Sequence, residues 1–313
     1  ANIAAFTRTD KKCLFQNRSY LLSNGVAVFK SLGEINNRRL VTICKDNSRF
    51  DDHVYNLGLD TIEKRELWKT RTIKEFNKEY AKIRNEAESA VISSEHFHSI
   101  LRSKNELDAL KNLLEVYFNE IQIIVYLRRQ DLVALSRYST ALREGYKNKR
   151  ILPQYIQESN PFYNYFNLLN LWSDCFGKHK IIPVIFERNN FVKSDLLTDF
   201  FIRTKLLDVN AFLKLNKPNK VNKSLAWQTQ IMLLKYNNLF NYNNNGFPKR
   251  SPKKIRGAIT LLMNSIFRGD GIKPTRAEAM DFYNIFKESN EKLGMEWFGN
   301  SKPFSEDFSM YPE

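Results

Sequence analysis

The sequence predicts an α/β protein with a parallel sheet that is covered by helices on both faces. Two observations support this class. The strand candidates at 90–97, 121–127 and 180–187 contain continuous apolar runs, and helical patterns separate them. Continuous rather than alternating apolar strands are typical of a parallel sheet buried on both sides. A regular alternation of strand and helix is the order in which such sheets are built.

The first ninety residues are expected to contain two helices and one short strand. Apolar residues recur at roughly helical spacing over 2–23, and Ser-Asn-Gly at 23–25 is a helix stop signal. The run VAVF at 26–29 is a short strand candidate. Residues 60–88 carry dense mixed charge, which predicts a long exposed helix.

Four helices are predicted in the middle of the chain, at 103–118, 131–146, 161–176 and from 195 to 201. Ser103 or Asn105 caps the first of them, and early acidic residues favour the same start. Gly177 ends the third, whose aromatic residues at helical spacing indicate core packing more than a stacking platform for a base.

Only helical periodicity is evident from about 206 to the end of the chain, where Asn and Lys become frequent. We therefore expect one domain over 1–313, with an α/β core at 1–205 and a mainly helical extension at 206–313. A chain of 313 residues is long enough to bury the core that this organisation requires.

The net charge of +15 at pH 7 is the unusual feature of the composition. Such a charge favours an anionic partner, which includes nucleic acid, a phosphorylated small molecule, a polyanion and a membrane surface. Charge alone does not choose between them. The densest basic run, KRSPKKIR at 249–256, is expected to be a solvated loop.

Cys13, Cys44 and Cys175 lie far apart and form no CxxC pair, so neither a zinc site nor a disulfide framework is indicated. We expect buried, reduced thiols in a cytoplasmic protein. No apolar run approaches the roughly 18 residues of a membrane span, and no signal peptide is visible. No metal-binding constellation is present.

The stretch YLRRQDLVALSRYS at 126–139 is the strongest candidate for a ligand site. In a parallel sheet, ligands bind beyond the carboxyl ends of the strands, where Arg128 and Arg129 are expected. The N–H groups at the start of the following helix favour an anion, and Ser136 can add a hydroxyl. An alternative is an ion pair of Arg129 with Asp131, with Ser136 on the helix surface.

This stretch resembles the 3′-phosphate-binding segment of sulfotransferases that use 3′-phosphoadenosine 5′-phosphosulfate. The matching residues are Arg128, directly after the strand, and Ser136, eight residues later. Within that family, the chain looks most like bacterial sulfotransferase-like proteins associated with surface polysaccharides. VISSEHF at 91–97, the unit at 171–201 and the tail FSEDFSMYPE at 304–313 also resemble them.

The resemblance implies a P-loop-type α/β fold, this phosphosulfate as co-substrate, and sulfuryl transfer to a carbohydrate hydroxyl without a metal. Arg128, Arg129 and Ser136 would bind the nucleotide. The catalytic base would be Glu95 or His96 in SSEH. If this segment is extended, adjacent side chains point in opposite directions, so only one of the two faces the acceptor, and we favour Glu95. The alternative is a helix start, with Ser93 or Ser94 as the cap and Glu95 favouring the helix dipole.

One part of the family pattern is not found. No glycine-rich loop with a lysine for the 5′-phosphosulfate occurs, and 2–23 looks like the helix that would follow such a loop. We therefore expect that the first strand and its loop are missing and that this polypeptide is weak or inactive. The alternative is a non-catalytic α/β protein that binds a nucleotide or polyanion.

No helix-turn-helix, zinc finger or RNA-recognition signature is present, and the basic residues are spread out, so nucleic acid is not expected as a partner. The expected partners are the nucleotide co-substrate and a glycan acceptor. The acceptor's identity and the oligomeric state cannot be derived from the sequence.

Overall fold

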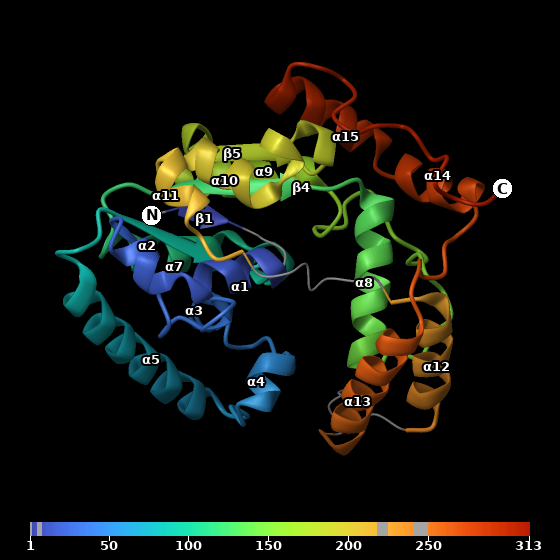
Figure 1. Ribbon diagram of the computed structural model, residues 1–313, viewed down its shortest axis with the longest axis horizontal. Coiled ribbons are helices and arrows are strands. Elements are labelled where there is room, and N and C mark those ends of the chain that lie inside the picture. The colour runs from blue at the N-terminus through green and yellow to red at the C-terminus, as the bar shows by residue number, and fades with distance from the viewer. Residues whose placement is uncertain (1, 5–7, 218–224, 241–249) are drawn as a thin grey trace. The chain divides into compact units, whose positions relative to one another are not determined.

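The computed structural model of the chain describes residues 2–4, 8–217, 225–240 and 250–313 (Figure 1). Contacts within the chain divide it into two compact units. The first unit comprises Ala1–Leu127 and Tyr165–Asn222, and the second comprises Arg128–Asn164 and Lys223–Glu313. Each unit is described by itself.

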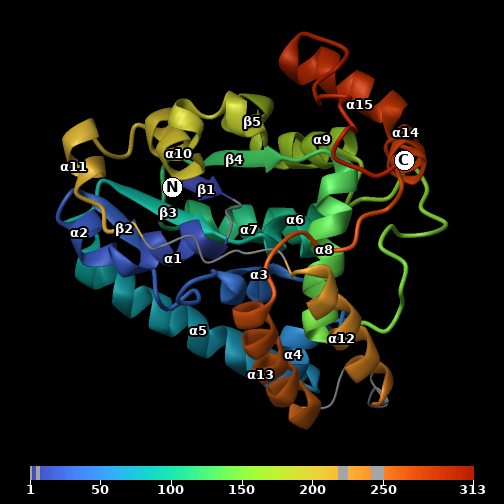
Figure 2. The ribbon, with the colours of Figure 1, turned by 45° about the vertical axis from the view of Figure 1, so that its right-hand side comes forward.

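The first unit contains a five-stranded sheet in which every neighbouring pair of strands is parallel (Figure 2). Its strands are β1 (Asn2–Ala4), β2 (Val26–Val28), β3 (Ser89–Ser93), β4 (Gln122–Leu127) and β5 (Ile181–Ile185), in the order β2-β3-β1-β4-β5. The prediction of an α/β protein with a parallel sheet is confirmed. The chain order reverses around β1, and this is the position at which parallel α/β sheets bind ligands.

The structure corrects the prediction of a continuous helix over 2–23. Residues 2–4 form β1, the central strand, which pairs with β3 on one side and with β4 on the other. The helices α1 (Arg8–Gln16) and α2 (Arg18–Leu22) follow. The expectation that the first strand is missing was therefore wrong, because a short apolar segment fits a strand and a helix equally well until it finds partner strands.

Helices cover both faces of the sheet. On one face, Leu14 and Leu21 of α1 and α2 and Phe200 of α10 (Leu196–Thr204) pack in a core cluster with Val91 and Ile124 of the strands. On the other face, α9 (Tyr165–Phe176) packs over β4 and β5 and also contacts α7 (Lys104–Glu115). The unit further contains α3 (Arg38–Cys44), α4 (Asp52–Asn56), α5 (Ile62–Ile83), α6 (His96–Ile100) and α11 (Val209–Leu213).

Local sequence signals explain where several of these helices begin. The Ser103 hydroxyl accepts a hydrogen bond from the Glu106 backbone and the Glu106 carboxylate accepts one from the Ser103 backbone, which is a capping box at the start of α7. Asp195 caps α10 in a related way, through the backbone of Thr198. These caps agree with the predicted starts of both helices.

The second unit consists of helices around α8 (Gln130–Glu144). Tyr138 and Leu142 of α8 pack against Leu233 and Leu234, and Ala134 packs in a separate cluster with Phe282. The other helices are α12 (Trp227–Asn238), α13 (Arg250–Ile266), α14 (Arg276–Asn284) and α15 (Lys287–Leu293). This division differs from the one expected at 205/206, because α8 lies with the C-terminal helices rather than with the strand that precedes it.

Part of the basic run at 249–256 is helical rather than a solvated loop. The helix α13 begins at Arg250, and Arg256 is buried. The Arg256 Nε donates to Asn237 Oδ1 at 2.7 Å, and Asn237 Nδ2 donates to the Leu142 carbonyl oxygen at 2.9 Å. A buried guanidinium needs such a partner, so the amide of Asn237 fixes α13 against α12 and α8.

The three cysteines are all buried, as predicted. Burial raises the pKa of the Cys44 thiol to about 12, so it remains protonated near neutral pH. Within the described residues, no helix has the length and apolar character needed to cross a bilayer.

Candidate functional site at the carboxyl end of β3

The candidate site lies in the first unit, where β3 ends beside the central strand. Ser93 ends β3 and is level with Ala4 of β1, and α6 begins three residues later at His96. Lys11 lies in the first turn of α1, the helix that follows β1 in the chain. The fold thus brings the segment at 93–96 next to the start of α1.

Lys11 and Glu95 form an ion pair at this edge. The Lys11 side chain is only 2% exposed, whereas 52% of the Glu95 side chain is exposed. Asn36 Nδ2 donates to the same carboxylate oxygen, Oε2, at 2.9 Å. Burial alone would raise the pKa of Glu95, but the positive charge of Lys11 outweighs it and the pKa is lowered. Glu95 is therefore ionised at neutral pH and can accept a proton.

His96 is the second predicted candidate for the base. Its Nε2 lies 3.9 Å from Glu95 Oε1, and its Nδ1 lies 3.3 Å from the Ser99 hydroxyl. Burial, followed by the positive charge of Arg38, lowers the pKa of His96 from 6.5 to about 4. The ring is thus neutral at pH 7, but it is a weaker base than an ordinary histidine.

The backbone at Glu95 and His96 is not the extended segment that the sequence analysis considered. Glu95 has helical dihedral angles (φ −64°, ψ −15°) and precedes α6, so the segment is not extended there and the two side chains do not alternate. The alternative of a capping cluster is present in part, since the His96 backbone N–H donates to the Ser94 hydroxyl at 3.2 Å. Glu95 itself makes no capping hydrogen bond. Its carboxylate is directed to Lys11 and Asn36 instead.

A second cation, Arg38, adds positive charge to the surroundings of His96. Arg38 Nη2 donates to Asp51 at 3.0 Å and to Asp52 at 3.5 Å. Its Nη1 is buried and has no hydrogen-bond partner within the described part of the chain. A buried guanidinium nitrogen with spare donor capacity favours a site that receives an anion.

The predicted nucleotide clamp falls in the second unit, whereas the predicted base falls in the first. Arg128 is half-buried, and Ser136 is exposed on α8. Arg129 is buried, and its Nε and Nη2 donate to the two carboxylate oxygens of Asp131 at 2.8 and 3.0 Å. The ion pair that the sequence left as an alternative is therefore what the structure contains.

The remaining terminal nitrogen of Arg129 is also occupied. Its Nη1 donates to the backbone carbonyls of Ser305 and Asp307 at 2.6 and 2.7 Å, and the guanidinium stacks on the Phe308 ring with a separation of 4.0 Å. Tyr311 donates a hydrogen bond to Asp131. Because every guanidinium nitrogen is used within the unit, we assign Arg129 a structural role and not a nucleotide contact.

Two pockets accompany these residues in the first unit. An apolar pocket with an empty volume of about 400 Å³, including its open side, lies between the sheet and α9 and is lined by Ser94, Phe97 and Trp172, among others. Phe97 and Trp172 meet edge to face, with ring centroids 6.5 Å apart. Ser94, which lines this pocket, directly precedes Glu95 in the chain. An apolar part of a ligand could therefore bind there.

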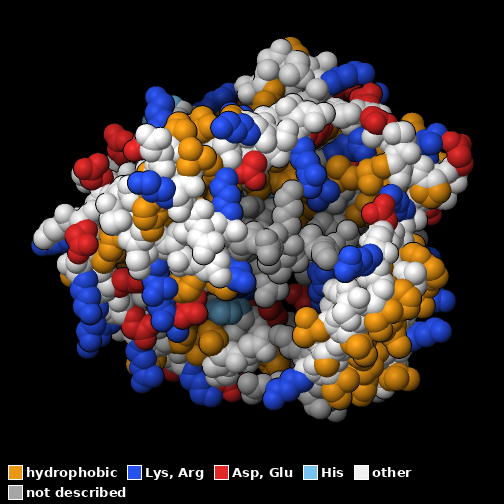
Figure 3. Space-filling model, in the orientation of Figure 1, with side chains coloured by type: hydrophobic (Ala, Val, Ile, Leu, Met, Phe, Trp, Pro, Cys, Tyr) orange, Lys and Arg blue, Asp and Glu red, His pale blue; other side chains and the backbone are white. Residues whose placement is uncertain are grey.

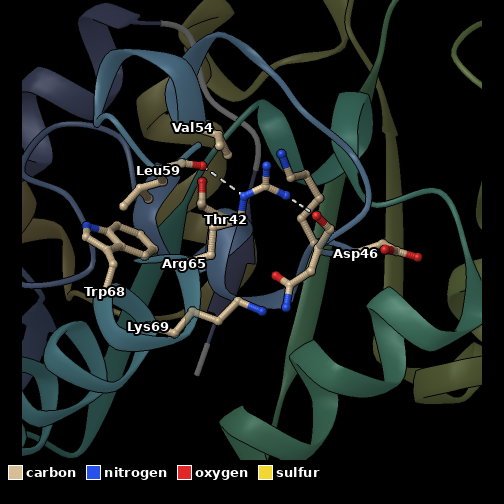
Figure 4. Close-up of a pocket in the computed structure, with 9 residues that line it drawn as sticks. Thr42, Asp46, Val54, Leu59, Arg65, Trp68 and Lys69 are labelled. Carbon is tan, nitrogen blue, oxygen red and sulfur yellow. Dashed lines mark hydrogen bonds between the residues drawn. The ribbon is translucent and has the colours of Figure 1, made fainter. Parts of the chain in front are cut away.

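The second pocket lies between α3 and α5 and contains several cations (Figure 4). Arg65 donates to the carbonyl of Leu59 at 3.0 Å and to that of Asn47. Lys45 pairs with Asp51 at 2.8 Å, and Lys69 pairs with Glu66 at 3.3 Å. Since these cations already have partners, we interpret this pocket as structural.

No group of three or more His, Cys, Asp or Glu side chains among the described residues is arranged to hold a metal ion. Sequence reasoning missed two residues of this candidate site, Arg38 and Lys11. The residues before it were read as one helix, so the lysine was not placed at the end of a strand. The basic pair Lys11-Lys12 soon after the apolar segment NIAA was the available signal.

No family model matches the chain. An uncharacterized protein of Archaeoglobus fulgidus is 26% identical over 217 residues, which cover 68% of this chain and 55% of that protein. The chain thus spans about half the length of this relative. Among solved structures, it is similar to the sulfotransferase domain of the Synechococcus PCC 7002 olefin synthase, with 14% identity, coverage of 91% and 93% of the two chains, and a TM-score of 0.31. A TM-score this low does not establish a shared fold.

Proposed function

We propose that the protein transfers a sulfuryl group from 3′-phosphoadenosine 5′-phosphosulfate to a hydroxyl group. The observation that carries this proposal is the pairing of Lys11 with Glu95 where the central strand and β3 end. Group transfer of this kind needs a cation for the leaving oxygen and a base for the acceptor hydroxyl. Both types of residue are present within contact distance of each other at a position where parallel sheets bind ligands.

The reaction assigns one role to each member of the pair. The acceptor oxygen forms a bond to sulfur while the bond between sulfur and the bridging phosphate oxygen breaks. Glu95 accepts the proton of the acceptor hydroxyl, and the electron pair leaves on the phosphate oxygen, where Lys11 stabilises the negative charge. Arg38 Nη1 can donate to an equatorial oxygen, over which charge is spread in such transfers.

The ion pair also couples binding of the co-substrate to activation of the base. The ion pair with Lys11 lowers the pKa of Glu95 and makes it a weak base. A phosphosulfate that draws Lys11 away removes this effect, while the burial that raises the pKa remains. Glu95 would then become a stronger base only when the co-substrate is bound.

Arg128 and Ser136 are the proposed contacts of the 3′-phosphate, as the sequence resemblance implies, and a carbohydrate hydroxyl is the proposed acceptor. Arg129 is left out of this set because its nitrogens are used by Asp131 and the C-terminal tail. His96 remains the alternative base, with the weakness that its low pKa brings.

The first test is calorimetric titration of 3′-phosphoadenosine 5′-phosphate, with AMP as the ligand that lacks the 3′-phosphate. We expect the former to bind more tightly, and Arg128→Ala and Ser136→Ala to reduce the difference. Ser139→Ala, on the same helix, is a control that should leave it unchanged. Equal binding of the two nucleotides would overturn the proposed clamp.

The second test measures sulfuryl transfer to a panel of carbohydrate acceptors. Glu95→Gln should lower turnover by roughly 10²–10⁴-fold, the usual contribution of a general base, whereas His96→Asn should have a much smaller effect. The reverse order would make His96 the base.

Binding without chemistry is the second candidate function, and one observation favours it. Glu95 Oε2 accepts hydrogen bonds from both Lys11 and Asn36, as in a structural ion pair. A protein that binds the nucleotide specifically, transfers no sulfuryl group and binds equally well as Glu95→Gln would support this alternative.

A further inference from the structure

The helix α13 in the second unit carries large apolar side chains beyond its buried side. The buried side includes Arg256 and Met263. The rest of the helix exposes Ile255, Leu261, Leu262 and Ile266, each between 51% and 76% exposed. A surface helix of a globular protein normally has a single apolar face, directed to the core. The four exposed residues are called the outer face of α13.

The neighbouring helix α12 adds to this exposed apolar surface. Met232 and Leu239 are 45% and 76% exposed, and they share a helix side with the exposed Lys235 because the three lie at i, i+3 and i+7. Trp227, at the start of α12, is also 51% exposed. Figure 3 shows hydrophobic side chains gathered at the lower right, where α13 lies, with basic side chains at their edge.

The charge of the surrounding sequence is the second observation. Residues 209–269 contain 11 Lys and Arg residues and no Asp or Glu. Most of the chain's net charge of +15 therefore arises in a stretch of 61 residues that includes α12 and α13. Lys254, one of these, is exposed beside Ile255 on the outer face.

We propose that the outer face of α13, with the exposed side of α12, docks on the surface of an anionic lipid bilayer. Aliphatic side chains can enter the boundary of the acyl region, while the exposed Lys235 and Lys254 of these two helices meet anionic headgroups. A nucleic acid would use the basic residues but leave the leucines and isoleucines exposed to water. A second copy of this chain would bring the same acid-free segment against itself, and the like charges would repel.

The inference does not depend on sulfuryl transfer. If both hold, the docked protein would meet acceptors that are attached to a lipid surface.

Cosedimentation with vesicles tests the proposal. Phosphatidylcholine vesicles containing an equal share of phosphatidylglycerol should bind the protein, and vesicles of phosphatidylcholine alone should bind it much more weakly. High salt should reduce binding to the anionic vesicles, because headgroup attraction is screened. Equal binding to both vesicle types, or no binding to either, would overturn the proposal.

Substitutions separate the apolar contribution to vesicle binding from the electrostatic one. Leu261→Ser with Leu262→Ser should weaken binding roughly tenfold for each leucine, since most of the burial of an apolar side chain is lost. Lys235→Ala with Lys254→Ala should weaken it roughly fivefold for each lysine. The matched controls are Leu67→Ser and Lys78→Ala on the exposed helix α5, which should bind like the wild type.

All these sites are exposed, so circular dichroism should show unchanged folding in every variant. Sedimentation velocity without vesicles tests whether a second copy of the chain covers the outer face of α13 instead. If the wild type is a dimer that dissociates in the double leucine variant, and neither binds vesicles, a second copy covers this face and the membrane proposal is wrong.

Discussion

Each of the two units contains a cation–carboxylate pair, and the two pairs differ in how fully they are enclosed. In the second unit, Arg129 and Asp131 are both buried, and all three guanidinium nitrogens donate hydrogen bonds within the unit. In the first unit, Lys11 is buried, but about half of the Glu95 side chain is open to solvent. We call them the closed pair and the open pair.

The difference separates a structural role from a functional one. A closed pair cannot accept a ligand without losing hydrogen bonds that are costly to break in a buried environment. An open pair can exchange one partner for another, because water or a ligand can reach the carboxylate. Burial would lower the pKa of Arg129, but its hydrogen bonds to Asp131 raise it, so the guanidinium remains charged. The open pair instead lowers the pKa of an accessible carboxylate.

The largest expected effect is on the closed pair. Asp131→Asn removes the charge that balances Arg129 and weakens the hydrogen bond from Tyr311. Breaking a buried ion pair typically costs about 3–5 kcal/mol of unfolding free energy. Urea unfolding monitored by circular dichroism measures this loss.

The matched control is the exposed pair of Glu288 with Lys292, four residues apart on α15. Glu288→Gln should change the free energy of unfolding far less than Asp131→Asn does, because exposed ion pairs contribute little to stability. A similar small change in Asp131→Asn would contradict the closed character of its pair.

The sequence predicted the long strands well and the short central strand poorly. β3, β4 and β5 have five or six residues, and their apolar runs identify them without tertiary information. β1 has only three described residues, and its pairing with β3 and β4 decides its conformation. The predicted α/β class is therefore confirmed, although the beginning of the predicted first helix was wrong.

The roles of the site residues depended on contacts between distant parts of the chain. The ion pair of Arg129 with Asp131 could be proposed from the sequence, because the two residues lie two positions apart. The further hydrogen bonds of Arg129 to the carbonyls of Ser305 and Asp307, more than 170 residues away, could not. The pairing of Lys11 with Glu95 likewise joins residues 84 positions apart. Glu95 could be proposed from the sequence, but its partner could not.

An intermediate effect is expected at the open pair of Lys11 and Glu95, where the pKa of Glu95 should change more than the free energy of unfolding. Lys11→Met keeps the buried aliphatic stem and removes the charge, so the pKa of Glu95 should rise. The unfolding free energy should change by less than about 1 kcal/mol, because the carboxylate can be hydrated. Carboxyl carbon NMR titration of both proteins measures the pKa.

The sign of the linkage is a further check. A lowered pKa contributes stability that is present above the usual carboxylate pKa and is lost as the pH falls through the lowered value. In Lys11→Met, the free energy of unfolding should therefore no longer fall with the protonation of Glu95 at acid pH. Lys12→Met, on the next residue, should leave both the Glu95 titration and the acid sensitivity as in the wild type. An unchanged pKa of Glu95 in Lys11→Met would contradict the open pair.

The smallest expected effect on stability is at Ser136, which lies on the exposed side of α8 while Asp131 lies on the buried side of the same helix. Ser136→Ala should change the unfolding free energy by no more than about 0.5 kcal/mol, since alanine is a good helix former and no buried contact is lost. The same urea series measures this. A large loss would mean that Ser136 has a structural role like that of Arg129. If stability is unchanged while binding of the 3′-phosphorylated nucleotide falls, Ser136 belongs with the open pair as a residue available to a ligand.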